Sequence, residues 1–167
     1  AETIRRAHRE FPVTAVENQY ALTFRRHEEE TFKVVEELGI GFVAYSPLDR
    51  GYLAGEMDAN TRFDPETDMR ASFPRLSPEA MGKNRIFIDF LDEIGRKRRA
   101  SCAQVALAWV LAQKPWIVPI PETTRRAHLL ENLRAPDIEF SPEEMSEINA
   151  RLSQMVPVGE RYAPGSD

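Results

Sequence analysis

The amino-acid sequence predicts an α/β protein in which three parallel strands are covered by helices. Apolar runs of strand length at 13–16, 40–44 and 117–120 alternate with longer segments of helical periodicity. The run 40–44 (IGFVA) is apolar almost throughout, which is typical of a strand buried on both faces of a parallel sheet. Alternation of this kind places successive strands parallel, with helices packed against them.

The first elements can be placed in order along the chain. Residues 1–10 have the pattern of a helix end and lead into the strand at 13–16. A helix is expected from about His27 to Leu38, because acidic residues occupy its first turn and Gly39 follows its last apolar residue. The strand 40–44 comes directly after this glycine.

The second half of the chain is expected to be mainly helical. The polar, proline-containing segment 49–78 predicts an extended loop, and loops of this length in compact domains are usually functional or disordered. Ser141 begins a capping box with proline at the first helical position, so a last helix starts there, and the tail 157–167 is expected to be loosely ordered. Further helices are predicted at 80–97, at 101–113 and from Thr124 to about Leu133.

Composition and charge exclude several classes of function. The 167 residues suffice for one domain with a sizeable core, and 42% of them are hydrophobic. The net charge is −5 and no basic stripe is present, which argues against nucleic acid as a partner. The one basic run, Arg96 to Arg99, suits the carboxyl end of a helix.

Cys102 is the single cysteine, so neither an intrachain disulfide nor a cysteine-based metal site is expected. This usage fits a cytoplasmic protein. No stretch has the length of a membrane span and no signal peptide is seen, so we expect no membrane partner. No metal site is expected either, because His8 and His27 have no ligand-like residues at metal spacing. The sequence begins at Ala1 within a helix-like pattern, which we interpret as a start inside a fold.

The segment 117–133 (IVPIPETTRRAHLLENL) joins a strand to a helix start that is rich in hydroxyls and guanidiniums. Thr123, Thr124 and Arg125 stand where a helix already offers free N–H groups and the positive end of its dipole. This combination is suited to binding a phosphate. The alternative is a plain amphipathic helix in which Thr124 serves only as the N-cap.

Four motifs along the chain resemble the aldo-keto reductase family. FPVTAVENQYAL is similar to its sixth barrel strand and LGIGFVAYSPLDRGYLAG to its seventh strand and following turn. CAQVALAWVLAQ is similar to its seventh barrel helix and VPIPETTRRAHLLENL to its eighth strand and phosphate-binding loop. The resemblance covers essentially the whole chain, from about the fifth barrel helix onward.

This resemblance implies that residues 1–167 are a single partial domain, the C-terminal part of a (β/α)8 TIM barrel. The family transfers hydride between NADP(H) and a carbonyl carbon or alcohol, so a small carbonyl compound is the implied substrate. A complete barrel has roughly 250 residues. Three strands leave open sheet edges, so the implied protein partners are the missing N-terminal half or a second copy of the chain.

The resemblance also implies roles for residues after the second strand. Tyr45 corresponds to the aromatic residue that stacks on the nicotinamide ring, and the turn that follows corresponds to the pyrophosphate contacts, with Ser46, Pro47, Leu48 and Gly51. Asp49 departs from the usual glycine, and a carboxylate near a pyrophosphate is unhelpful unless it points to solvent. The alternatives are a core tyrosine at a barrel rim followed by an ordinary loop.

Glu17 stands where the family usually has a glutamine that contacts the carboxamide of nicotinamide. A carboxylate can accept a hydrogen bond from the amide NH2 but cannot donate to its oxygen. The alternative is a solvated acid at the end of a strand.

By the same resemblance, Thr123, Thr124 and Arg125 hold the 2′-phosphate of NADP, while Glu131 and Asn132 contact adenine. His128 replaces an arginine that is common in the family, and Glu122 places an acid beside the expected phosphate. Because an acid there favours NAD over NADP, NAD remains a possible cofactor.

No catalytic residue can be assigned. In the family the catalytic Asp, Tyr, Lys and His lie on the first four strands, and no such segment exists in this sequence. The chain alone is therefore expected to be inactive, as the cofactor-binding half of an NADP(H)-dependent oxidoreductase. The alternatives are a non-catalytic nucleotide-binding or assembly module and an inactive truncation product.

Overall fold

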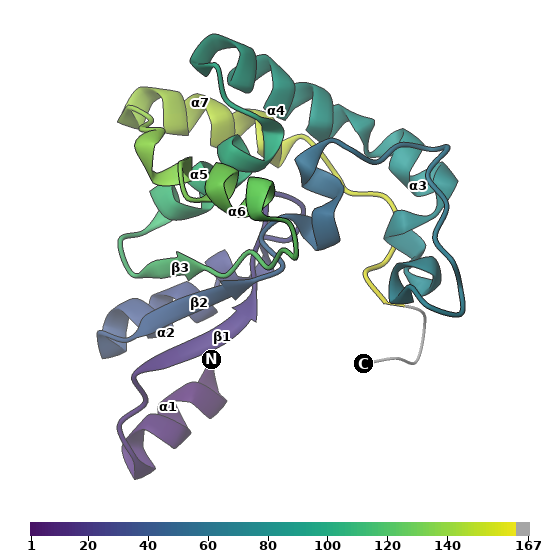
Figure 1. Ribbon diagram of the computed structural model, residues 1–167. Helices are drawn as coiled ribbons and strands as arrows, with labels where there is room; N and C mark the ends of the chain where they lie inside the picture. Colours follow the sequence, from purple (N-terminus) through teal and green to yellow (C-terminus); the bar gives the residue numbers. More distant parts are fainter. Residues whose placement is uncertain (163–167) are drawn as a thin grey trace.

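The computed structural model describes residues 1–162, which form a parallel sheet with helices packed against it (Figure 1). The strands are β1 (Ala15–Gln19), β2 (Gly41–Tyr45) and β3 (Ile117–Pro119), in that spatial order and all parallel. The predicted three-stranded parallel arrangement is therefore confirmed. β1 begins and ends later than predicted, which places Glu17 in the middle of the strand rather than at its end.

One face of the sheet is buried under helices. Phe42 and Ala44 of β2 are fully buried, and the Phe42 ring lies 5.0 Å from that of Phe32 on α2 (Thr31–Leu38). The opposite face carries Glu17, Val43 and Val118 in one register row, of which Glu17 and Val118 are exposed. The expectation that 40–44 is buried on both faces is wrong, because the helices of residues 1–162 cover only one of them.

The helices between β2 and β3 differ from the prediction in one place. Instead of one helix at 80–97, the chain forms α3 (Pro78–Lys83) and α4 (Arg85–Arg98), separated at Asn84. The buried Asn84 side chain bonds both backbone groups of Val158, donating from Nδ2 at 2.9 Å and accepting at Oδ1 at 2.8 Å. Asn84, between the two helices, thus connects them to the C-terminal segment.

Two of the helices begin at serine capping boxes. Ser101 caps α5 (Cys102–Gln113) and Ser141 caps α7 (Pro142–Ser153), each through a complete capping box. The predicted apolar helix at 101–113 is well buried, with Trp109 inside the core and stacked on Tyr20 at 5.4 Å. The chain opens with α1 (Glu2–Glu10), and the short α6 (Arg126–Asn132) follows β3.

The segment 49–78 is more ordered than an extended loop. It contains three short 3-10 helices, η2 (Asp49–Ala54), η3 (Met69–Ser72) and η4 (Pro74–Leu76), and an earlier one, η1 (Arg26–Glu28), precedes α2. Buried side chains such as Tyr52 and Leu53 anchor the segment to the core. They are too widely spaced along the segment to give a periodic pattern. Tyr52 Oη donates to the backbone oxygen of Met81 at 2.6 Å.

The C-terminal tail returns beside this segment (Figure 1). Arg75 donates from its backbone N–H to Glu160 O at 3.0 Å and from Nε to Gly159 O at 3.1 Å. The prediction of a loosely ordered tail is therefore wrong for 157–162, where long-range hydrogen bonds replace regular structure. Residues 163–167 lie outside the part of the chain described.

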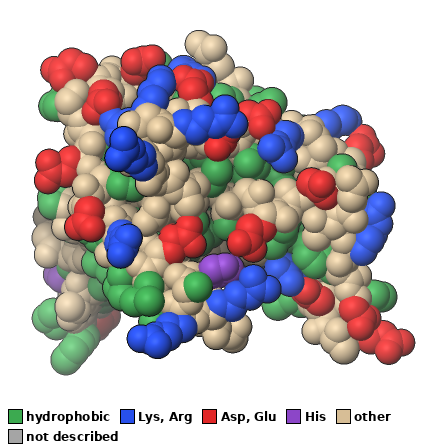
Figure 2. Space-filling view, turned by 45° about the horizontal axis from the view of Figure 1, so that its top comes forward, with side chains coloured by type: hydrophobic (Ala, Val, Ile, Leu, Met, Phe, Trp, Pro, Cys, Tyr) green, Lys and Arg blue, Asp and Glu red, His purple; other side chains and the backbone are tan. Residues whose placement is uncertain are grey.

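Charged side chains of both signs are interspersed over the surface (Figure 2). The basic run at the end of α4 is balanced, since Arg96 and Lys97 pair with acids one turn earlier and Arg98 pairs with Glu144. No helix within residues 1–162 is long and apolar enough to cross a membrane.

Candidate nucleotide-binding site at the carboxyl ends of the strands

Tyr45 ends β2, and the chain then enters a turn of unusual backbone geometry. Ser46, Asp49, Arg50 and Gly51 all have positive φ, at 49°, 47°, 57° and 92°. Glycine adopts such values freely and aspartate or asparagine tolerates them, but they are uncommon for serine and arginine, and strained backbone concentrates at functional sites. The backbone at Gly51 suits a glycine, and three non-glycine neighbours share its positive φ.

The carboxylate of Asp49 does not point to solvent. Its side chain is buried, accepts a hydrogen bond from Thr23 Oγ1 at 2.7 Å, and lies 3.8 Å from Arg75 Nη1. Both partners are distant in sequence, and for this reason the pairing could not be predicted. Through these two contacts the Asp49 carboxylate attaches the turn to Thr23 and Arg75.

Gln19 is the residue paired with Tyr45 across the β1–β2 ladder. Directly paired residues of parallel strands project from the same face, so Gln19 and Tyr45 are neighbours on the open side of the sheet. The Gln19 side chain is buried, and its Oε1 has no hydrogen-bond donor among the described residues. Glu17 lies two residues earlier on the same face and is exposed, paired with Val43.

The Tyr45 hydroxyl contacts the returning tail. Arg161 Nη1 donates to Tyr45 Oη at 3.0 Å, and the guanidinium carbon lies 5.0 Å from the centre of the Tyr45 ring. Tyr45 itself is half-buried. The aromatic ring predicted to stack on a nicotinamide is therefore at the edge of the core.

Arg125 and His128 lie after β3 and contact one carboxylate. Glu56 Oε2 is 3.9 Å from Arg125 Nη1, and Glu56 Oε1 is 3.4 Å from His128 Nε2. The Arg125 and Glu56 side chains are well exposed. Two donors predicted to hold a phosphate thus converge on an anionic group.

The threonines before α6 act differently from the N-cap prediction. Arg125, not Thr124, is the N-cap residue of α6, and its side chain makes no capping bond. Instead, Thr123 Oγ1 accepts from the backbone N–H of Arg125 at 3.1 Å. Thr124 is exposed, as are Glu122 and Arg126.

Glu131 and Asn132 end α6 and are half-buried. The backbone oxygen of Glu131 accepts from Gln104 Nε2 of α5 at 3.0 Å, which fixes this end of the helix. No side-chain hydrogen bond of either residue is found within residues 1–162.

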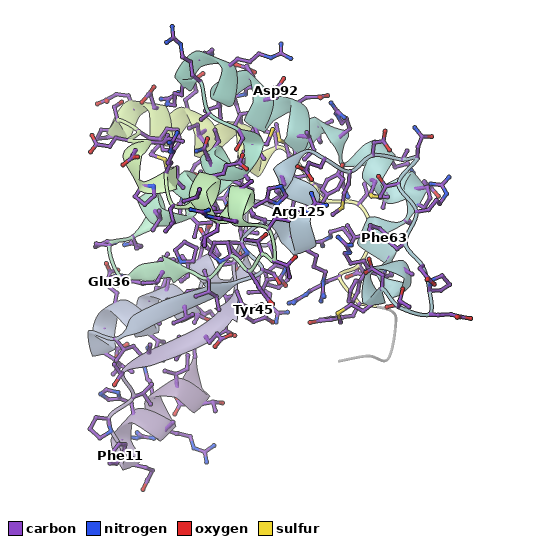
Figure 3. The ribbon with its side chains drawn as sticks, viewed as in Figure 1. Phe11, Glu36, Tyr45, Phe63, Asp92 and Arg125 are labelled. Atoms are coloured by element: carbon purple, nitrogen blue, oxygen red, sulfur yellow. The ribbon has the colours of Figure 1, made fainter. Side chains whose placement is uncertain are left out.

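The predicted residues come together at one end of the sheet. Tyr45 is the last residue of β2 and Arg125 lies beyond the carboxyl end of β3, on the side where η2 packs, whereas Glu36 lies at the opposite end of the sheet (Figure 3). β2 and β3 are adjacent, and Ile120 N continues their pairing with a bond to Ala44 O at 3.0 Å.

Three residues of this region were missed from the sequence. Gln19 could have been found from its spacing, since it lies two residues after Glu17 on a strand and hence on the same face. Glu56 and Arg161 carry no local signal, because both reach the site through long-range contacts.

Comparison with known proteins identifies the family. A model of the aldo/keto reductase family matches residues 1–152. A probable aldo-keto reductase 1 from Glycine max is 38% identical over 170 residues, a match that covers 99% of this chain and 47% of the plant protein.

Solved structures show the same architecture. A glycerol dehydrogenase from Gluconobacter oxydans superposes with a TM-score of 0.79 at 21% identity, covering 99% of this chain and 50% of the other. A thermostable aldo-keto reductase in complex with the inhibitor epalrestat gives 0.63 at 27% identity, covering 89% and 44%. An aldo/keto reductase from Klebsiella pneumoniae in complex with NADP and acetate gives 0.60 at 20% identity, covering 91% and 44%.

The fold prediction is confirmed, since the three parallel strands and their helices match about half of aldo-keto reductase TIM barrels. The chain spans about half the length of the relatives it matches. On the family match over residues 1–152 and the identity to the plant protein, this chain belongs to the aldo/keto reductase family.

Proposed function

We propose that this chain is the cofactor-binding half of an oxidoreductase that transfers hydride between NADP(H) and a small carbonyl compound or alcohol. The observation that carries the proposal is the position of Tyr45 and the Arg125–His128 pair at the carboxyl ends of adjacent parallel strands. Barrels of this fold build their active sites at that end. A structural relative from Klebsiella pneumoniae is in complex with NADP.

The residues at this end fit a nicotinamide nucleotide. The Gln19 side chain offers a buried oxygen without a donor, which matches the NH2 of a carboxamide. Tyr45 beside it offers a flat ring for stacking, an interaction of about 0.5–1.5 kcal/mol. The left-handed turn from Ser46 to Gly51 presents closely approachable backbone for the pyrophosphate.

Bound NADPH would supply the hydride, and the residues of this chain would orient the cofactor. In this arrangement Tyr45 covers one face of the nicotinamide, so that the other face meets the substrate. Glu17 and Gln19 hold the carboxamide, Arg125 and His128 bind the 2′-phosphate with Thr123 and Thr124, and Glu131 and Asn132 contact adenine. No residue of this chain is assigned as catalytic. The proton donor comes from the segment that carries the first barrel strands.

Selectivity for NADP over NAD is proposed on the basis of Arg125 and His128. Glu122 and Glu56 oppose it, because carboxylates near a 2′-phosphate repel it. Glu122 is exposed and makes no hydrogen bond within the described residues, and Glu56 is well exposed, so solvent screens both charges. We therefore propose NADP(H) as the preferred cofactor and NAD(H) as a weaker one.

Residues 1–167 are proposed to be one partial domain that acts together with an N-terminal half, in a cytoplasmic protein. A direct test uses the purified protein that contains this chain. NADPH is titrated by fluorescence, and its oxidation at 340 nm is followed with a panel of aldehydes and ketones. The proposal expects NADPH binding and substrate-dependent oxidation. A folded protein that binds neither NADPH nor NADH would refute it.

A further inference from the structure

Two arginines meet at the carboxyl end of β2, beside Tyr45. Arg50 belongs to the left-handed turn, and its guanidinium carbon lies 3.6 Å from the centre of the Phe73 ring. Arg161 arrives from the tail and bonds the Tyr45 hydroxyl. Both guanidiniums lie against the ring of Tyr162, at 5.5 Å for Arg50 and 4.5 Å for Arg161.

These two guanidiniums have no carboxylate partner of their own among the described residues. Within residues 1–162 no carboxylate forms an ion pair with Arg50 or Arg161, and the nearby Asp49 is occupied by Thr23 and Arg75. Burial lowers the pKa of Arg50, and the charge of Arg161 lowers it further. Arg161 Nε is buried and has no acceptor among the described residues. Buried donors on cations are costly unless an acceptor meets them.

Stacking on aromatic rings does not by itself explain this arrangement. A guanidinium stacked by its face keeps its in-plane N–H groups free for a carboxylate or phosphate. Four of the five other arginines that lie over aromatic rings in residues 1–162 use those groups on a carboxylate, namely Arg25, Arg70, Arg98 and Arg151, whereas Arg26 over Phe24 does not. Arg50 and Arg161 also lie over aromatic rings but have no carboxylate partner within residues 1–162, and the one hydrogen bond that Arg161 makes there goes to the Tyr45 hydroxyl.

We propose that Arg50 and Arg161 form a subsite for an anionic group, a carboxylate or a phosphate, next to Tyr45. Its assignment to a substrate rests on the proposed function, in which the reacting carbonyl lies near the nicotinamide held by Tyr45. The anionic group is then the acidic end of a carbonyl substrate. A phosphate of the cofactor offers the same chemistry from a second source.

Binding measurements on the protein that contains this chain test the subsite. The ligands are 4-carboxybenzaldehyde and benzaldehyde, titrated by calorimetry, and NADPH, titrated by fluorescence. The variants are Arg161→Gln and Arg50→Asn, the latter because asparagine tolerates positive φ. The control is Arg5→Gln, which removes an exposed guanidinium paired with Glu37, near the amino end of β2. Circular dichroism and thermal unfolding establish that each variant is folded.

Each arginine variant is expected to bind 4-carboxybenzaldehyde roughly tenfold or more weakly, since a charge-assisted hydrogen bond is lost. Benzaldehyde affinity stays unchanged, and Arg5→Gln changes neither affinity. Arg161→Lys, which keeps the charge without the planar fork, gives an intermediate loss. If the variants lose affinity for NADPH instead of for the charged aldehyde, the bound anion is a phosphate of the cofactor, and the subsite is still supported.

Folded variants with unchanged affinity for both 4-carboxybenzaldehyde and NADPH would overturn the subsite, and so would an unmodified protein that binds neither. The two proposals fail separately. Arginine-dependent binding of the charged aldehyde without NADPH oxidation supports the subsite and refutes the reductase. NADPH oxidation that both arginine variants retain in full, with unchanged affinities, refutes the subsite alone.

Discussion

The carboxylate of Glu56 lies between Arg125 and His128, the two side chains proposed to bind the 2′-phosphate. It is 3.9 Å from Arg125 Nη1 and 3.4 Å from His128 Nε2. Ion pairs between exposed side chains contribute about 0–1 kcal/mol, because water and salt screen them. We therefore expect a doubly charged phosphate with several oxygens to displace this carboxylate.

Arg125→Ala is expected to weaken binding of NADPH much more than binding of NADH. The lost charge-assisted hydrogen bond amounts to about 1.5–3 kcal/mol, or on the order of tenfold to a hundredfold in affinity. Arg126→Ala is the matched control, because Arg126 is the exposed next residue and makes no ion pair within the described residues. Fluorescence titration measures all four affinities. Equal losses for both cofactors would rule out the 2′-phosphate assignment.

At this scale the sequence predicts local geometry better than long-range contacts. The position of Gly51 in a tight turn follows from its residue type, and the structure agrees. The burial of Asp49 could not be predicted, because its two partners are distant in the sequence. Thr23 lies 26 residues before Asp49 and Arg75 lies 26 residues after it. Arg161 reaches Tyr45 across 116 residues and was missed for the same reason.

Gly95 shows how the end of α4 depends on a backbone contact. The N–H of Ala100 donates to Gly95 O at 2.9 Å, and a Cβ at residue 95 would collide with the backbone oxygen of Ala100. Gly82 on α3 is different, since the nearest atom to its Cβ position is Ala59 Cβ at 3.7 Å, an ordinary contact. The two helical glycines therefore form a matched pair.

Gly95→Ala is expected to destabilise the protein by about 1–3 kcal/mol, because the clash exceeds the gain of about 1 kcal/mol that alanine brings to a helix. Gly82→Ala is expected to be neutral or to stabilise by up to about 1 kcal/mol. Urea unfolding followed by circular dichroism compares the two. A Gly95→Ala protein as stable as Gly82→Ala would contradict the packing described at the end of α4.

Glu93 joins α4 to α7. Its carboxylate accepts from Arg151 Nη2 at 2.8 Å and from Lys97 Nζ at 3.3 Å, and these bonds lower the pKa of Glu93 to about 2 from an ordinary 4.5. A carboxylate with a lowered folded-state pKa contributes stability above its unfolded pKa and loses it as the pH falls. The window of loss therefore runs from about 4.5 down to about 2.

Glu93→Gln is accordingly expected to lower the unfolding midpoint at pH 7 and to have little effect near pH 2, where the wild-type carboxylate is also losing its charge. Thermal unfolding of both proteins across this range measures the difference. Glu79→Gln is the control, since Glu79 pairs only within α3, with Lys83. A difference between Glu93→Gln and wild type that does not shrink on acidification would contradict the ion-pair explanation.

Element boundaries were predictable where a capping residue marks them. Ser141 starts α7 as its capping box indicates, and the helix predicted at 101–113 follows Ser101, whose capping box is seen only in the structure. The split between α3 and α4 was not, because apolar periodicity continues through Asn84 and only the tertiary bonds to Val158 reveal the break. Likewise, an apolar run predicts burial of β2 but not which face the helices cover.

The whole molecule resembles a barrel wall whose inner side is open. Val118 is 57% exposed and Ile120 43% exposed, which is unusual for apolar residues of a central sheet. The outer edges of β1 and β3 have no neighbouring strand within residues 1–162. Open edges and an uncovered apolar face favour association with further strands. An N-terminal half of a family barrel would cover both, and association between copies is the alternative.

The most direct test of the account assays the 167-residue chain alone. Reduction of a carbonyl requires a proton donor near the developing alkoxide, and the account places that donor on barrel strands that this chain does not contain. One sample is the pure chain, confirmed by mass. The second is the chain co-expressed and purified with a polypeptide that carries the first five strands of a family barrel. Each sample is incubated with NADPH and a reactive aldehyde. The account predicts no turnover by the chain alone and turnover only in the combined sample. Turnover by the chain alone that persists through further purification would show that the catalytic residues lie within these 167 residues.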